Sequence, residues 1–249
     1  MCARLSAKSV AHLVDEFNFS GFSNQATLEF SNNMQDVTAF ADTDETFVEG
    51  KPGFTFNVQG LLDLIAGGYD AEMFLDLTVA ARKVGIYPGG LADGNFGYEG
   101  DTLITESPRV AEVGGAAALN VTWRGNTPAV RSVMLDVDTA RGTSGNGTSY
   151  EYGAALAADT IVGTLRLLAA PAGAGNNTLD IIIQSDTTGF PSPTTRLTFA
   201  QLTQASVATF EVVTAAGAVT DTFWRVNYVY AGVGSRTFSV VITFGIKKT

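Results

Sequence analysis

Carboxylates are concentrated in one short acidic segment, at Asp42, Asp44, Glu45 and Glu49. Carboxylate oxygens suit calcium, and Asp42, Asp44 and Thr46 have the spacing of the first ligands in a twelve-residue calcium loop. That loop requires glycine at its sixth position, where this chain has Phe47. We therefore expect a solvated acidic segment that meets basic residues of a neighbouring molecule, with no metal or other cofactor.

Catalytic residues of other kinds are scarce. His12 is the single histidine and Cys2 the single cysteine, whereas zinc sites use several such ligands. We interpret His12 as a surface or interface residue. The glycine-rich segment 89–97 lacks the strand-to-helix context of a dinucleotide site. Carboxylate pairs are abundant, but no glycosidase motif accompanies them. We expect no enzymatic activity.

Aromatic residues near the C-terminus raise a binding hypothesis. Trp224, Tyr228 and Tyr230 are spaced to share one face of a strand over Phe223–Tyr230. On an exposed face they would form a stacking platform for a sugar or a cell surface. The alternative is that the row belongs to a core, which is the more frequent arrangement.

Two predicted strands flank the acidic segment. Gln25–Phe30 and Phe54–Gln59 alternate apolar and polar residues, and the intervening loop, Ser31–Gly50, is much longer than a hairpin needs. Loops of that length are usually functional. Thr55 and Asn57, with Asn120 and Thr122 of a predicted strand Ala116–Arg124, would give two strands a polar face.

One short helix is expected near residues 69–79. Asp70 is placed to be its N-cap, and Met73, Phe74 and Leu77 would share its buried face.

The remaining pattern predicts an all-β fold made of two β-sandwich domains. The segment TARGTSGNG has a linker composition, so we expect a first domain over 1–138, a linker over 139–146 and a second domain over 147–249. In the second domain, strands are spaced by eight to twelve residues and end at Gly, Pro or Asn. We expect Leu179–Gln184 to be buried on both faces and Thr237–Phe244 to have one solvent face.

Charge and hydropathy exclude several partners. The formal net charge is −10, with 19 Asp+Glu against 8 Lys+Arg in residues 1–138. We do not expect an acidic domain to bind nucleic acid tightly, although it could line a channel that DNA passes through. No segment approaches the ~20 apolar residues of a membrane span, and a single cysteine fits folding in a reducing cytoplasm.

The phrases DVTAF-D and F-EG, and the C-terminal TLDIIIQSD and FWRVNYVYAG, carry a resemblance. The chain resembles the major tail tube protein of long-tailed (siphovirus-type) bacteriophages, followed by a C-terminal sandwich decoration domain. The resemblance implies a virion tail protein, assembled in the host cytoplasm, whose first domain closes into a ring β-barrel on forming hexameric rings. Stacked rings would enclose tape-measure and other tail proteins and conduct DNA without specific binding.

In that family the long loop reaches the next ring. The inter-ring candidates that the resemblance implies here are Asp36, Phe40, Asp42, Asp44, Glu45, Phe47 and Glu49. The alternative function is a capsid decoration protein or a carbohydrate-binding adhesin of a virion, which would use the C-terminal aromatics.

Overall fold

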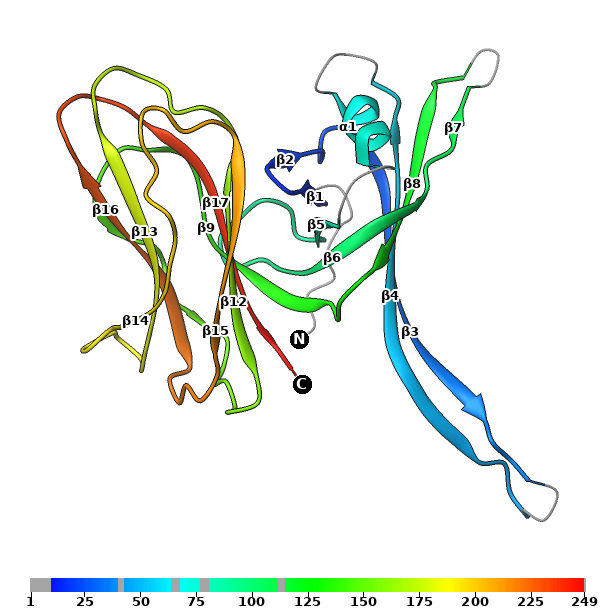
Figure 1. The fold of residues 1–249 in the computed structure, drawn as a ribbon. Coiled ribbons are helices and arrows are strands. Elements are labelled where there is room, and N and C mark those ends of the chain that lie inside the picture. The colour runs from blue at the N-terminus through cyan, green and yellow to red at the C-terminus, as the bar shows by residue number, and fades with distance from the viewer. Residues whose placement is uncertain (1–9, 40–42, 64–67, 77–80, 112–114, 249) are drawn as a thin grey trace. The chain divides into compact units, whose positions relative to one another are not determined.

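The computed structural model describes residues 10–39, 43–63, 68–76, 81–111 and 115–248. These residues form a nearly all-β protein with one short helix, which confirms the predicted fold class (Figure 1). The chain divides into two compact units. Unit 1 comprises 1–20, 85–99 and 130–249, and unit 2 comprises 21–84 and 100–129.

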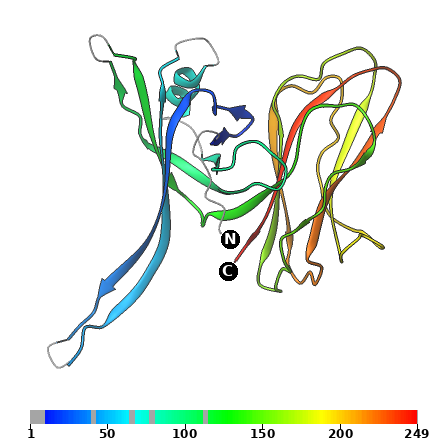
Figure 2. The same ribbon diagram turned by 180° about the vertical axis from the view of Figure 1, so that it is seen from behind.

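Unit 1 is a β-sandwich of two facing sheets (Figure 2). Its larger sheet has the strand order β15-β12-β17-β9-β6-β5-β1-β2. These strands are β1 (Ala11–Val14), β2 (Phe17–Asn18), β5 (Arg82–Tyr87), β6 (Phe96–Glu106), β9 (Val130–Arg141), β12 (Thr160–Leu167), β15 (Thr209–Ala216) and β17 (Phe238–Lys247). The second sheet contains β10 (Gly145–Asn146), β11 (Tyr150–Glu151), β13 (Thr178–Asp186), β14 (Thr194–Thr198) and β16 (Phe223–Ala231).

Burial in two of these strands is the reverse of the prediction. From Thr178 to Ser185, β13 alternates between half-buried and buried residues, so it has one partly exposed face instead of none. β17 is buried on both faces apart from Ser239 and Lys247. One face of β17 packs in the sandwich core through Phe244 and its in-phase neighbours, whereas Val241 on the other face packs against β1 and Tyr87. Because other residues cover both faces of this central strand, neither face is exposed to solvent.

Charged side chains are also buried in unit 1. Arg166 of β12 donates from Nη1 to Glu99 Oε1 over 2.7 Å and from Nε to the carbonyl of Asp15 over 2.8 Å. Glu99 Oε2 accepts hydrogen bonds from the hydroxyls of Thr164 and Thr243. The Arg166 and Glu99 side chains are 0% and 5% exposed, so these bonds, and not water, stabilise the carboxylate.

Unit 2 is built on β3 (Ser23–Asp36), β4 (Phe47–Leu61), β8 (Ala118–Gly125), the last residues of β6, and β7 (Arg109–Val110). β3 pairs with β4, β4 with β8, and β8 with both β6 and β7. Helix α1 (Tyr69–Asp76) covers the apolar side, with Tyr69 and Met73 buried one turn apart. Phe54 lies over Gly100 and Gly125, where any Cβ would come within about 2.2 Å of its ring.

The prediction of a loop over Ser31–Gly50 is wrong, because most of this segment forms strands β3 and β4. β3 and β4 pair as one long antiparallel hairpin from Ser23 opposite Gly60 to Asp36 opposite Phe47. Every residue whose exposure is described beyond position 29 of β3 is exposed, so burial imposes no alternation there. β4 pairs with β8 only from Thr55 onward. Pro52 comes before that point, where β4 is an edge strand and proline is tolerated.

The helix prediction was right in place and wrong in detail. α1 begins at Tyr69, so Asp70 lies inside it and pairs with Arg109 instead of capping. Met73 is buried as expected, but Phe74 is 65% exposed, and Leu77 lies outside the described residues.

The two compact units divide the chain differently from the predicted boundary at 138. β9 runs through that position to Arg141 and pairs with β17, and β10 lies within the predicted linker 139–146. Residues 10–14 and 85–99 also contribute strands to unit 1. Each unit is made of several chain segments, so a change of composition at one point of the sequence cannot mark the boundary between them.

Candidate functional site: the polar sheet face and long hairpin of unit 2

One face of the β3–β4–β8 sheet is polar in three successive cross-strand rows. The register aligns Gln25 with Gln59 and Asn120, Thr27 with Asn57 and Thr122, and Glu29 with Thr55 and Arg124. Residues directly opposite on neighbouring strands share a face, so the nine side chains form one surface. The predicted polar face of residues 54–59 and 116–124 is thereby confirmed, and β3 extends it by one strand.

The opposite face is apolar. Phe56 and Val58 of β4 and Val121 and Trp123 of β8 are at most 2% exposed. This strict inside–outside alternation fixes the register, because a slip by one residue would expose the whole core face. The polar rows are therefore held by the hydrophobic core behind them.

The polar face is slightly hollowed. A shallow groove along it is lined by Gln25, Thr27, Asn57, Gln59, Asn120 and Thr122, together with Glu106 of β6. Among the three rows and Glu106, the charged side chains are Glu29, Glu106 and Arg124. Amide and hydroxyl groups thus dominate a surface with little net charge of its own.

On either side of the β4–β8 pair lies a strand with one partner, and on the β8 side this strand, β7, is two residues long and lies beside the part of β8 that pairs with β6. In the described part of the chain, β3 pairs only with β4, and β7 pairs only with β8. A strand with a free edge presents unpaired N–H and C=O groups to another strand. β3 is 14 residues long, so the edge that faces away from β4 is a long one.

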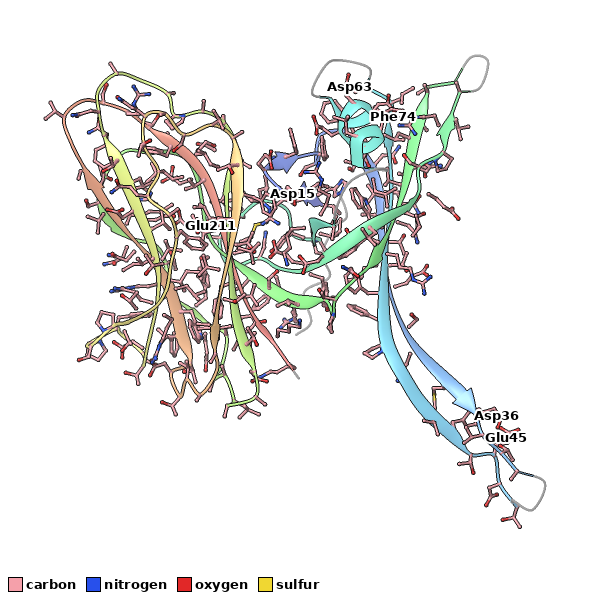
Figure 3. All side chains as sticks on the ribbon, in the orientation of Figure 1. Asp15, Asp36, Glu45, Asp63, Phe74 and Glu211 are labelled. Atoms are coloured by element: carbon pink, nitrogen blue, oxygen red, sulfur yellow. The ribbon has the colours of Figure 1, made fainter. Side chains whose placement is uncertain are left out.

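The far end of the hairpin holds the predicted inter-ring residues that the structure describes. Figure 3 shows Asp36 and Glu45 there, at the end of unit 2 opposite to Phe74 of α1. Asp36, Asp44, Glu45 and Phe47 are all exposed. Phe40, Asp42 and the Glu49 side chain lie outside the described residues. The Thr38 hydroxyl and amide donate to Asp36 over 2.5 and 2.9 Å and lower the pKa of its carboxyl.

Exposed apolar residues also gather on this hairpin, and the sequence reasoning had named only Phe47 among them. They are Phe30, Met34, Val37, Phe47 and Val48, each between 47% and 60% exposed. Large apolar side chains gathered on a surface indicate an interaction site. The available signal was that all of them except Phe30 occur inside a segment otherwise interpreted as a polar loop.

The C-terminal aromatics do not form an exposed platform. Trp224 and Tyr228 are at most 1% exposed and belong to the core of unit 1, against which the half-buried Tyr230 packs. Tyr228 donates to Asp136 Oδ2 over 2.7 Å. Burial and the nearby Asp136 carboxylate raise the pKa of Tyr228 well above its ordinary value. The proposed surface role of these residues is corrected, because their ring faces are covered by the opposite sheet.

His12 is also buried, contrary to the surface assignment. It lies on β1 with its ring 6.0 Å from that of Phe19. Burial disfavours the charged imidazolium and lowers the pKa of His12 to about 3. The histidine therefore stays neutral at physiological pH.

Metal-binding clusters and membrane-spanning helices are both absent from the described residues. These residues contain no group of three or more His, Cys, Asp or Glu side chains arranged to hold a metal ion. Their one helix is too short and too polar to cross a membrane.

No protein-family model and no curated protein sequence matches this chain. Among solved structures, the chain is similar to a protein in the virion of a native gene transfer agent particle, at 11% identity and TM-score 0.42, over 51% of this chain and 98% of that one. It is also similar to the Dit protein of phage SPP1, at 12% identity and TM-score 0.39, over 97% of this chain and 100% of that one. A protein of the phage p2 baseplate matches at 9% identity and TM-score 0.35, over 96% and 98% of the two chains. At these TM-scores, the resemblance alone assigns no function.

Proposed function

We propose that this chain is a structural protein of a bacteriophage tail that assembles into closed rings through unit 2. The sequence resemblance to tail tube proteins suggests this class, and six copies per ring is the number that the resemblance implies. The observation that carries the proposal is that β3 and β7, on opposite sides of the β4–β8 pair, each have a single partner strand in the described part of the chain.

Free edges at both ends of a sheet favour a ring. If β3 of one copy pairs with the β6–β7 end of the next, each contact leaves another pair of edges open, and only closure satisfies all of them. A closed barrel has no edges. The polar rows on one sheet face would then form one continuous wall, with α1 on the other side of the barrel.

The composition of that wall fits passage of DNA without binding. Only Arg124 is cationic among the three polar rows and Glu106, and it is outnumbered by Glu29 and Glu106. Unit 2 as a whole holds 13 Asp+Glu against 5 Lys+Arg. A wall of neutral hydrogen-bonding groups in an acidic unit offers phosphates few sites at which to bind.

Cysteine cross-linking tests the closure directly. In a Cys2→Ser background, Glu106→Cys is combined in turn with Gln25→Cys, Thr27→Cys or Glu29→Cys, since all four side chains belong to the polar face. Under oxidation, at least one pair should give a ladder of covalent oligomers that ends at the ring size seen by electron microscopy.

The single-cysteine variants are the matched controls. They can form at most dimers, because each copy then carries one thiol. A dimer as the largest product of all three double variants, with no rings in micrographs, would refute the proposal.

A further inference from the structure

Unit 1 presents an exposed cation on an aromatic surface at the rim of its core. The guanidinium of Arg131 on β9 lies 4.1 Å from the ring centre of Phe96 on β6. Phe96 in turn stacks on Tyr152, with ring centres 6.0 Å apart. Tyr152 closes the core against Phe244, whereas Phe96 remains 37% exposed. We call Arg131, Phe96 and Tyr152 the Arg131 surface.

The charge of Arg131 is available to a ligand. Within the part of the chain that the structure describes, no ion pair or side-chain hydrogen bond engages its guanidinium, and the Phe96 ring is its contact. A guanidinium that contacts an aromatic ring still has N–H groups to donate, and their planar fork matches carboxylates. This surface therefore suits a partner that is both acidic and apolar.

The far end of the β3–β4 hairpin has that chemistry. Asp36 pairs directly with Phe47 in the register, and Met34 lies two residues from Asp36 on the same strand. These three side chains consequently share one face of the hairpin. Asp44 and Glu45 add two exposed carboxylates at the turn. Two such acidic ends repel each other, so a hairpin does not dock on another hairpin.

We propose that the far end of the hairpin of one copy docks on the Arg131 surface of another copy. This inference rests on the proposed function, because it names the partner of the hairpin between successive rings. The complementary charges, and the match of Met34 and Phe47 to the partly exposed Phe96 ring, are the grounds for choosing a second copy as the occupant.

The contact is heterologous, since two different surfaces of the chain meet. A heterologous contact that does not close on itself propagates as a stack. Ring closure through the sheet edges and stacking through the hairpin would thus be separate interactions that separate substitutions can remove.

Charge exchange tests the docking. Arg131→Glu and the double change Asp44→Lys with Glu45→Lys are made singly and together in the full chain. Each alone should shorten stacks at least tenfold in micrographs while leaving single rings intact. Combining them should restore most of the length, because the two charges are exchanged. Arg225→Glu is the matched control, since Arg225 also lies over a phenylalanine ring, Phe190, at 4.2 Å.

A second measurement does not depend on tubes. A labelled peptide of residues 31–53, closed by a terminal disulfide, should bind the full chain and bind Arg131→Glu at least tenfold more weakly. Equal binding by the two proteins, or stacks that ignore the charge exchange, would overturn the docking. Wild-type protein that forms no rings at all would instead count against the proposed function.

Discussion

Replacing Arg166 by methionine should destabilise the protein strongly. The change removes a cation that is 0% exposed and leaves Glu99, at 5% exposure, without its partner at 2.7 Å. Breaking a buried ion pair from one side costs about 3–5 kcal/mol, because a charge stays buried uncompensated. With an m-value of about 3 kcal/mol/M, the urea midpoint should fall by about 1 M or more.

Two further variants make this prediction specific. Arg196→Met removes a partner from Asp221 at 3.0 Å, but Arg196 is 28% exposed, so the cost should stay below about 1 kcal/mol. Adding Glu99→Gln to Arg166→Met should recover part of the loss, because the orphaned charge disappears. Equal urea midpoints for Arg166→Met and Arg196→Met would refute the reasoning that burial decides the cost.

Three other predictions concern separate parts of the chain. His12 is the only histidine, and its pKa of about 3 lies below the unfolded value. Its NMR signal should therefore not titrate between pH 8 and 5, and a titration midpoint near 6.5 would contradict this. Because the unfolded chain binds a proton that the folded protein excludes, the free energy of unfolding should fall by up to about 1.4 kcal/mol per pH unit as the pH drops below about 6.5. Deleting Asn32–Glu49 should leave the circular dichroism of a β protein and abolish long tubes; tubes of normal length would show that the hairpin is dispensable. Arg141 is held by Asp136 at 3.1 Å and Asp138 at 2.9 Å, so trypsin should spare it, whereas early cleavage there into two folded fragments would support the boundary predicted at 139–146.

The polar face could be predicted because a strand with one buried face has alternating apolar and polar residues in its sequence. Phe54, Phe56 and Val58 must pack inside, so Thr55 and Asn57 must point the other way. The same rule found most strands of unit 1. It requires only that one face of a strand be covered and the other wet.

The rule fails where both faces have the same environment. The far half of the hairpin is exposed on both sides, so its pairing depends on backbone hydrogen bonds that no side-chain pattern records. β17 is covered on both sides, and nothing in its own residues indicates that β1 lies behind it. The burial of Arg166 has the same origin, since its partners Asp15 and Glu99 come from distant chain segments.

The chain passes between the two units four times, at residues 20–21, 84–85, 99–100 and 129–130. Two of these passages lie within continuous strands, since β5 begins in unit 2 and ends in unit 1, and β6 begins in unit 1 and ends in unit 2. Mechanical load passing between the units along the backbone is therefore divided among several covalent connections instead of falling on one tether. Neither unit can be released by a single cut, so a protein exposed to pulling forces would keep both units attached after one strand scission.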